Sequence, residues 1–264
     1  MKEESGIMLP VSIPQLYVSA SILPEAWEKS LIALKSDGIS SRKESYTDPK
    51  GVDHILEASM TMVVKTPARE PMLHRGCEGL FMLGQYVEEV LEGVKDSYIG
   101  EYWDYTYHQR LFKYESPEGQ AVNQIQYLAK KLTECSFTNR AQATTWMPWR
   151  DQFAKGPPCL QRIWCKVVSD EYLEMHTSWR SRDAYNAAFM NMYALVQLQK
   201  TIANQIGVKV GQYVDYSDSY HVYQRNLNQL DKFLETVRKN REMGISPWAP
   251  SNLLKKFQRN DSTK

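Results

Sequence analysis

The chain has 264 residues, of which 42% are hydrophobic and 24% are charged, and its formal net charge is +1. This composition is typical of a soluble globular protein, and it lacks the basic surplus of a polynucleotide-binding protein. The apolar stretches stop short of the roughly 18–20 residues that a membrane span needs, and the start, MKEESGIMLPVS, does not resemble a signal peptide. We therefore expect one cytoplasmic domain over residues 1–264, with a polar tail from about 257, that binds neither membranes nor polynucleotides.

The four cysteines are few and widely spread for a chain of this length: Cys77, Cys135, Cys159 and Cys165. A disulfide-rich scaffold needs a denser set, and a structural zinc site usually contains a CxxC pair, which is absent from the sequence. We predict no metal site.

The first half of the chain predicts strands and helices around one polar run. Residues 36–51 are rich in turn formers and predict an exposed loop, a candidate mobile lid. The alternation in 59–65 predicts a strand, and 141–146 predicts another. Apolar residues recur at helical spacing in two further segments: Leu80, Leu83, Val87, Val90 and Val94, and then Val122, Ile125, Leu128 and Leu132.

The second half predicts a hairpin that leads into a long helix. Residues 162–168 and 173–179 are expected to pair as strands, and the helix after them should end at Gly207. A strand over 210–216 and an amphipathic helix around 230–237 follow. The order of elements is that of an α+β protein rather than of regular βαβ repeats.

Cys159 is a candidate nucleophile because Pro157 and Pro158 stiffen the backbone directly before its thiol. A thiol of ordinary pKa, about 8.5, needs nearby positive charge to attack at neutral pH. The hairpin brings Arg180 beside Cys159 and supplies that charge. Taken alone, such a cysteine is more often a small buried apolar residue.

Two other groups suit a nucleotide. Arg180 and Ser181 can share a phosphate through a guanidinium and a hydroxyl, although they also fit a solvated helix cap. Asn191 offers one acceptor and two donors inside an apolar helix, which complements the N3–H and O4 edge of uracil. His221 and Tyr223 lie on one side of an extended backbone and can reach a sugar hydroxyl together, although a half-buried strand surface has the same pattern.

In order and spacing, these motifs resemble the signature of thymidylate synthases. The likeness is carried by PPC at 157–159, RSRD at 180–183, Asn191 and HVY at 221–223, and it is strongest from Asn139 to Asn226. TTWMPWRDQ and RSRDAYNAAFMNMYAL look more like the methanogen-type archaeal branch than the bacterial enzymes. The resemblance implies a single α+β domain whose mixed twisted sheet is covered by helices and forms an obligate homodimer.

The resemblance also implies a reaction, the methylation of dUMP to dTMP. Cys159 would attack C6 of the pyrimidine, and C5 would then capture the one-carbon unit of 5,10-methylenetetrahydrofolate or of a methanopterin analogue. Asn191 would orient the base, and Glu78 and Tyr107 match the catalytic glutamate and tyrosine. Binding roles fall to further residues: Arg180, Ser181, Arg42 and the partner chain's Arg140 at the 5′-phosphate, His221 and Tyr223 at the 3′-hydroxyl, and Asp183 at the folate pterin.

The chain departs from the family pattern at several positions. Leu160, Asn139 and Ser219 replace the usual histidine, arginine and aspartate, and the tail is polar where the family closes an apolar segment over the folate. Weaker closure would let water capture the methylene, so a pyrimidine nucleotide 5-hydroxymethylase is the alternative function. A relative that binds nucleotide or RNA without turnover is the second alternative.

Overall fold

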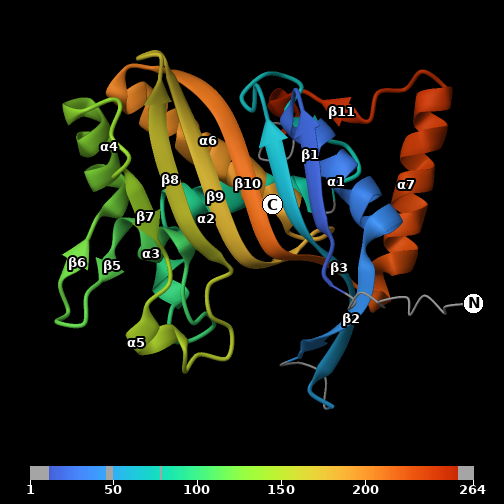
Figure 1. The fold of residues 1–264 in the computed structure, drawn as a ribbon, viewed down its shortest axis with the longest axis horizontal. Coiled ribbons are helices and arrows are strands. Elements are labelled where there is room, and N and C mark those ends of the chain that lie inside the picture. Colours follow the sequence, from blue (N-terminus) through green and yellow to red (C-terminus); the bar gives the residue numbers. More distant parts are fainter. Residues whose placement is uncertain (1–11, 46–49, 78, 255–264) are drawn as a thin grey trace, which may run out of the picture.

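The structure is a computed structural model that describes residues 12–45, 50–77 and 79–254. Within these ranges the protein contains a seven-stranded mixed sheet in the order β1-β3-β10-β9-β8-β7, with β2 paired to β3 (Figure 1). The strands are β1 (Gln15–Ala20), β2 (Ile39–Glu44), β3 (Val52–Val64), β7 (Gln142–Thr144), β8 (Leu160–Val168), β9 (Tyr172–Asp183) and β10 (Lys209–Tyr223). Two pairs are parallel, β1 with β3 and β9 with β10, and the others are antiparallel.

Helices cover the far side of the sheet in the view of Figure 1, where α1, α2 and α6 lie behind the strands. The helices are α1 (Leu23–Asp37), α2 (Leu83–Leu91), α3 (Tyr107–Phe112), α4 (Gln124–Glu134), α5 (Pro148–Asp151), α6 (Ala188–Ile206) and α7 (Leu227–Glu242). Short 3₁₀ turns form at Leu80–Met82, Asp96–Tyr98, Gln224–Asn226 and Ser251–Leu253, and small strand pairs join β4 (Leu73–His74) to β11 (Trp248–Ala249) and β5 (Tyr114–Glu115) to β6 (Ala121–Val122). None of the helices in the described ranges has the length and apolar character of a membrane span.

The predicted hairpin and the helix after it form the centre of the fold. Residues Leu173, Met175, Thr177 and Trp179 of β9 are all buried on one face, as their alternation predicts. The helix α6 packs on β9 and β10 and ends where expected, at Gly207, whose φ of 75° is a left-handed conformation that glycine adopts without strain. These elements place the ends of β9 and β10 next to the start of β8.

The expectation of a loop over residues 36–51 is wrong for most of the described part of that segment. Residues 36 and 37 end α1, and Ile39–Glu44 form β2, which pairs with β3 alone among the described strands. A strand at the edge of a sheet tolerates alternating polar side chains, because one side of the ladder and much of its surface face water. Arg42 therefore lies on a strand, and residues 46–49 lie outside the described part.

The opposite face of the sheet has no helix over it among the described residues. Along β9, Glu174, His176 and Ser178 point to this face and are only half-buried, while their neighbours on the other face are buried. Tyr17 of β1 is 66% exposed on the same side as Ser19. One face of a largely antiparallel sheet can be left open to water or to a partner in this way.

Candidate active site

Cys159 lies directly before β8, between buried Pro158 and buried Leu160, and its side chain is half-buried against the core. Its carbonyl accepts from the backbone N–H of Arg180 at 3.0 Å. The guanidinium of Arg180 folds back on the same loop and donates to the carbonyls of Pro157 at 2.6 Å and Pro158 at 3.0 Å. A fixed positive charge therefore lies beside the loop that carries the thiol, as the predicted hairpin requires.

Two tyrosines complete the wall next to the thiol. The hydroxyl of Tyr107, the first residue of α3, accepts the backbone N–H of Leu160 at 3.3 Å, and its ring meets Trp179 edge-on at 5.9 Å. Burial raises the pKa of Tyr107 well above its usual value, and the neighbouring Tyr105 and Cys159 add to the shift. Burial also raises the pKa of Tyr105 to about 12. Both phenols are therefore neutral near pH 7 and can donate a proton in a hydrogen bond.

Several of the residues predicted to form the site line a cavity of about 450 Å³ that includes Cys159. Its lining includes Cys159, Arg180, Ser181 and Arg42, which come from the loop before β8, from β9 and from β2. The cavity is thus a pocket that contains a thiol, two guanidinium groups and a hydroxyl. Such a set can hold a phosphate next to a nucleophile.

His221 and Tyr223 lie together near the end of β10, with ring centroids 5.1 Å apart. Sequence reasoning missed their partner, Lys43 of β2, whose Nζ is 2.7 Å from the Tyr223 hydroxyl and 3.3 Å from His221 Nε2. It also missed Glu57 of β3, a buried carboxylate in the cavity lining that accepts from the Ser219 hydroxyl at 2.7 Å. The resemblance to thymidylate synthases implies an aspartate at the position of Ser219, and here Glu57 places a carboxylate next to Ser219 from the neighbouring strand.

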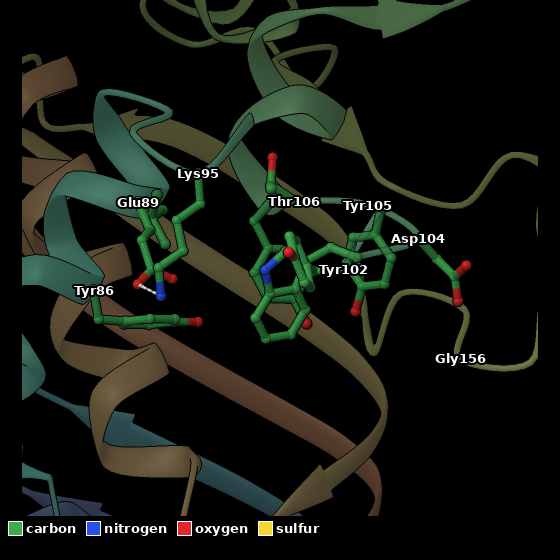
Figure 2. A pocket seen from close by; sticks show the side chains of 11 residues that line it. Tyr86, Glu89, Lys95, Tyr102, Asp104, Tyr105, Thr106 and Gly156 are labelled. Atoms are coloured by element: carbon green, nitrogen blue, oxygen red, sulfur yellow. Dashed lines mark ion pairs between the residues drawn. The ribbon is translucent and has the colours of Figure 1, made fainter. Parts of the chain in front are cut away.

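A second pocket, of about 410 Å³, adjoins the first and shares Tyr105 and Gly156 with it. Figure 2 shows Tyr86 beside the Glu89–Lys95 ion pair, and Tyr105 near Asp104 and Gly156. We call it the aromatic pocket, because its lining includes the rings of Tyr86, Tyr102, Trp103, Tyr105 and Tyr107.

Asn191 lies on α6, where its Nδ2 donates to the hydroxyl of Tyr86. The amide is buried and joined to the wall of the aromatic pocket, so it does not line the thiol cavity. Asn186 precedes this helix in a turn and donates to Asp183 from both its backbone and its side chain.

The remaining predicted residues are not brought into the cavity. The Asp183 carboxylate caps the turn by accepting the backbone N–H groups of Tyr185 and Asn186. Arg140 is exposed just before edge strand β7 and is absent from the cavity lining. Glu78 lies outside the described residues. Within the described ranges, no group of three or more His, Cys, Asp or Glu is arranged to hold a metal ion.

A buried ion pair holds β9 to β10 behind the cavity. Arg182 pairs with Asp215, both are almost inaccessible to solvent, and the guanidinium lies 4.0 Å above the ring of Trp179. The Asp215 carboxylate also accepts from Thr177, Trp179 and Tyr213. This network fixes the strand segment from which Arg180 and Ser181 extend.

We expect Arg182→Met to destabilise the fold by about 3–5 kcal/mol, because it leaves the Asp215 charge buried without its partner. Arg238→Met is the control, since Arg238 pairs with Glu235 on the exposed side of α7 and its loss should leave the stability nearly unchanged. Urea unfolding at one fixed protein concentration measures both. Equal, small losses would mean that the Arg182–Asp215 pair adds no stability.

Comparison with known proteins agrees with this fold. The family model for thymidylate synthase matches residues 90–262. A protein of Methanococcoides burtonii that is provisionally named a thymidylate synthase is 25% identical over 221 residues, which cover 84% of this chain and 95% of that protein. A similarly named protein of Methanocaldococcus jannaschii is 30% identical over 185 residues, 68% of this chain and 78% of the relative. The thermostable thymidylate synthase A from Bacillus subtilis superposes with a TM-score of 0.64 at 19% identity, covering 81% of this chain and 84% of that one.

The fold is therefore an α+β fold of the thymidylate synthase type, as the sequence motifs predict. The chain belongs to the thymidylate synthase family. The likeness to methanogen proteins confirms the archaeal-type resemblance of its motifs.

Proposed function

We propose that the protein is a thymidylate synthase that methylates dUMP to dTMP, with Cys159 as the nucleophile. The observation that carries the proposal is the cavity of about 450 Å³, in which Cys159 lies with Arg180, Ser181 and Arg42. A nucleoside monophosphate needs an anion site at one end and a reactive group at the base end. Family membership supplies the reaction class, a transfer of one carbon to C5 of a pyrimidine nucleotide.

In this proposal Cys159 Sγ forms a bond to C6 of the pyrimidine, and the electron pair of the C5–C6 double bond moves toward O4. Carbon 5 is then nucleophilic and forms a bond to the carbon of the one-carbon unit. Loss of the C5 proton and release of the carrier would leave an exocyclic methylene, and addition of a hydride to that methylene would expel Cys159 Sγ and restore the C5–C6 double bond. Arg180 keeps positive charge beside the attacking thiol and, with Ser181 and Arg42, contacts the 5′-phosphate. Tyr107 and Glu78 serve proton transfer near the base.

The aromatic pocket is the place that fits a one-carbon carrier. Its rings of Tyr102, Trp103 and Tyr105 suit a flat bicyclic heterocycle, and it meets the thiol cavity at Tyr105. Methylenetetrahydrofolate, or a methanopterin analogue, supplies the one-carbon unit and the reducing hydride. Asp183 is proposed to contact its pterin ring from the turn before α6.

The open sheet face and the position of Arg140 support a homodimer. We propose that two copies pack through this face and that Arg140 of each chain reaches the partner's phosphate site. The exposed position of Arg140 before β7 leaves its side chain available for such a contact. A C₂ dimer would then contain two equivalent sites, each completed by the other chain.

The proposal is tested by incubating the protein with 5-fluoro-dUMP and methylenetetrahydrofolate. We expect a stable covalent complex at Cys159, detected by mass spectrometry of the intact protein and of its peptides, because fluorine at C5 cannot leave as a proton does. Turnover of dUMP should give dTMP and the absorbance of dihydrofolate. A 5-hydroxymethyl product would instead identify a hydroxymethylase, and nucleotide binding without C5–H exchange would identify a non-catalytic relative.

Base choice gives a sharper prediction at Asn191, whose amide would have to turn from the Tyr86 hydroxyl to the base when the nucleotide binds. Asn191→Asp should favour dCMP over dUMP, because a carboxyl group accepts from the 4-amino group and, when protonated, donates to N3. The Tyr86 hydroxyl can donate to a carboxylate as readily as it accepts from the amide, so the helix should tolerate the change. Unpaired buried polar groups cost roughly 1–3 kcal/mol each, so the ratio of C5–H exchange rates should move about tenfold or more. An unchanged ratio in a folded variant would remove Asn191 from base recognition.

A further inference from the structure

Tyr105 lines the cavity that contains Cys159, although the sequence motifs singled out its neighbour Tyr107. Tyr107 lines the aromatic pocket but is absent from the lining of the thiol cavity, whereas Tyr105 belongs to both. The ring centroids of the two tyrosines are 5.5 Å apart. Tyr105 is therefore the phenol that a molecule bound at the thiol meets, with Tyr107 behind it.

The hydroxyl of Tyr107 is engaged as both acceptor and donor. Its oxygen accepts the backbone N–H of Leu160 at 3.3 Å. Burial is the main cause of the raised pKa values of both tyrosines, and the hydrogen bond between their hydroxyls raises the pKa of Tyr107 and lowers that of Tyr105. These opposite effects are expected when Tyr107 donates and Tyr105 accepts. A phenol has one proton to donate, so a proton that leaves Tyr107 passes first to Tyr105.

The Tyr105 oxygen accepts from Tyr107 and from the backbone N–H of Cys159, which uses both of its lone pairs. The guanidinium of Arg110 lies 5.5 Å from the centre of the Tyr105 ring, and two hydrogen bonds to Asp151 hold Arg110 in place. The ring is thereby fixed in its orientation. The group that remains is the O–H of Tyr105, which can donate into the thiol cavity.

The sulfur of Cys159 is close to this hydroxyl. After burial, the charge of the Cys159 thiolate has the largest effect on the pKa of Tyr105 and raises it, whereas Arg180 has a smaller effect and lowers it. Arg180 directs its Nε and Nη2 at the carbonyls of Pro158 and Pro157. These two donors therefore place positive charge near the thiol without a hydrogen bond to the sulfur.

Other charged groups face Cys159 across the cavity from three strands: Arg42, Lys43 and Glu44 on β2, Glu57 on β3 and Arg180 on β9. The cations favour a thiolate and the carboxylates oppose it. Because these charges partly cancel, a direct hydrogen bond to the sulfur has a large part in stabilising the thiolate.

We propose that Tyr105 is a catalytic residue whose hydroxyl donates a hydrogen bond to Cys159 Sγ, and that Tyr107 is a positioning residue that acts through it. The inference rests on the proposed function and adds a group to the same site. The pKa of Tyr105, about 12, is well above the ordinary thiol pKa of about 8.5, so the phenol keeps its proton when the thiol has lost its own. The hydrogen bond stabilises the sulfur anion both as the nucleophile that attacks C6 and as the leaving group.

The test measures the pKa of Cys159 from the pH dependence of its alkylation by iodoacetamide, followed at the Cys159 peptide by mass spectrometry. Tyr105→Phe removes the hydroxyl and keeps the ring beside Arg110. Loss of a hydrogen bond to a charged group should raise the pKa of Cys159 by roughly one unit, which leaves about tenfold less thiolate near pH 7. C5–H exchange should fall by a similar factor, while binding of dUMP stays within about twofold of wild type.

Two further variants separate the roles of the tyrosines. Tyr127→Phe removes an exposed phenol on α4 and should leave the pKa of Cys159 and the exchange rate unchanged. Tyr107→Phe should raise the pKa of Cys159 by less than Tyr105→Phe does, because it only weakens the donor. The double variant should equal Tyr105→Phe, since Tyr107 acts through Tyr105. A role of Tyr107 in proton transfer alone would leave the pKa of Cys159 unchanged.

A second measurement needs no Tyr105 variant. In the wild-type protein, the NMR signal of the Tyr105 ring should shift with pH at the midpoint of Cys159 alkylation, and this shift should be absent from Cys159→Ala. An unchanged pKa of Cys159 in folded Tyr105→Phe, or a Tyr105 signal that does not respond to the thiol, would overturn the proposal. Both measurements are made without nucleotide, so such a failure leaves the proposed reaction standing. Absence of C5–H exchange in a protein that shows the expected pKa change would overturn the reaction instead.

Discussion

Cys159→Ala should lower C5–H exchange and dTMP formation by at least about a thousandfold, because the covalent bond to C6 is the step that makes C5 reactive. Covalent capture of 5-fluoro-dUMP should disappear with it. Binding of dUMP should stay within about tenfold of wild type, because the groups proposed to hold the phosphate are Arg180, Ser181 and Arg42, which line the cavity and remain intact. Exchange of tritium from C5 and calorimetric titration with dUMP measure the two quantities.

The matched control is Cys135→Ala, which removes a half-buried thiol at the end of α4, outside the lining of the cavity. That variant should exchange and bind like the wild type. If Cys159→Ala keeps most of its activity, the covalent mechanism is wrong, whatever the protein binds. If Cys159→Ala loses dUMP binding together with exchange, the thiol contributes to the shape of the site as well as to the chemistry.

Mixing Arg140→Ala protein with Cys159→Ala protein should restore activity from two nearly inactive samples. In a heterodimer, the Cys159 of one chain meets the intact Arg140 of the other, so one of its two sites is complete. Random exchange of subunits makes half of the dimers mixed, which corresponds to about a quarter of the wild-type sites. The assay is C5–H exchange at a dUMP concentration below KM, after subunit exchange has been verified by native mass spectrometry.

Arg180→Ala mixed with Cys159→Ala gives the opposite expectation and serves as the control. The guanidinium of Arg180 is bonded to the Cys159 loop of its own chain, so no site in the mixture contains both residues intact. Restoration in this control would mean that activity returns for a reason other than shared sites. Dimers that exchange subunits in the first mixture yet stay inactive would place Arg140 within its own chain's site or outside both.

The central part of the fold follows from local patterns in the sequence. Alternation in 173–179 and helical spacing in α6 are strong because one face of each element is buried over its whole length. The same hairpin pattern is sufficient to predict that Arg180 lies beside Cys159, and the backbone bond between them confirms it. Contacts within one hairpin are predictable because the pairing register follows from the chain itself.

Contacts that depend on three strands could not be predicted in this way. Lys43 meets Tyr223 because β2 pairs with β3 and β3 with β10, and the segment containing Lys43 is polar enough to predict a loop. Glu57 contacts Ser219 through the pairing of β3 with β10. An isolated glutamate in an apolar strand is costly to bury without a partner, so the sequence did indicate that Glu57 would have one. Asn191 shows the same limit, since its spacing places it on α6 but says nothing of Tyr86.

Tyr105 forms part of the wall of both pockets, and this has a thermodynamic consequence. A ligand that contacts the ring from the thiol cavity would restrict the orientations of the ring in the neighbouring pocket. Coupling between two binding sites is reciprocal. If the nucleotide in the thiol cavity increases the affinity of the aromatic pocket for its ligand by some factor, that ligand increases the affinity for the nucleotide by the same factor. Replacing Tyr105 with a smaller residue would then reduce the cooperativity of the pair more than the affinity of either ligand alone.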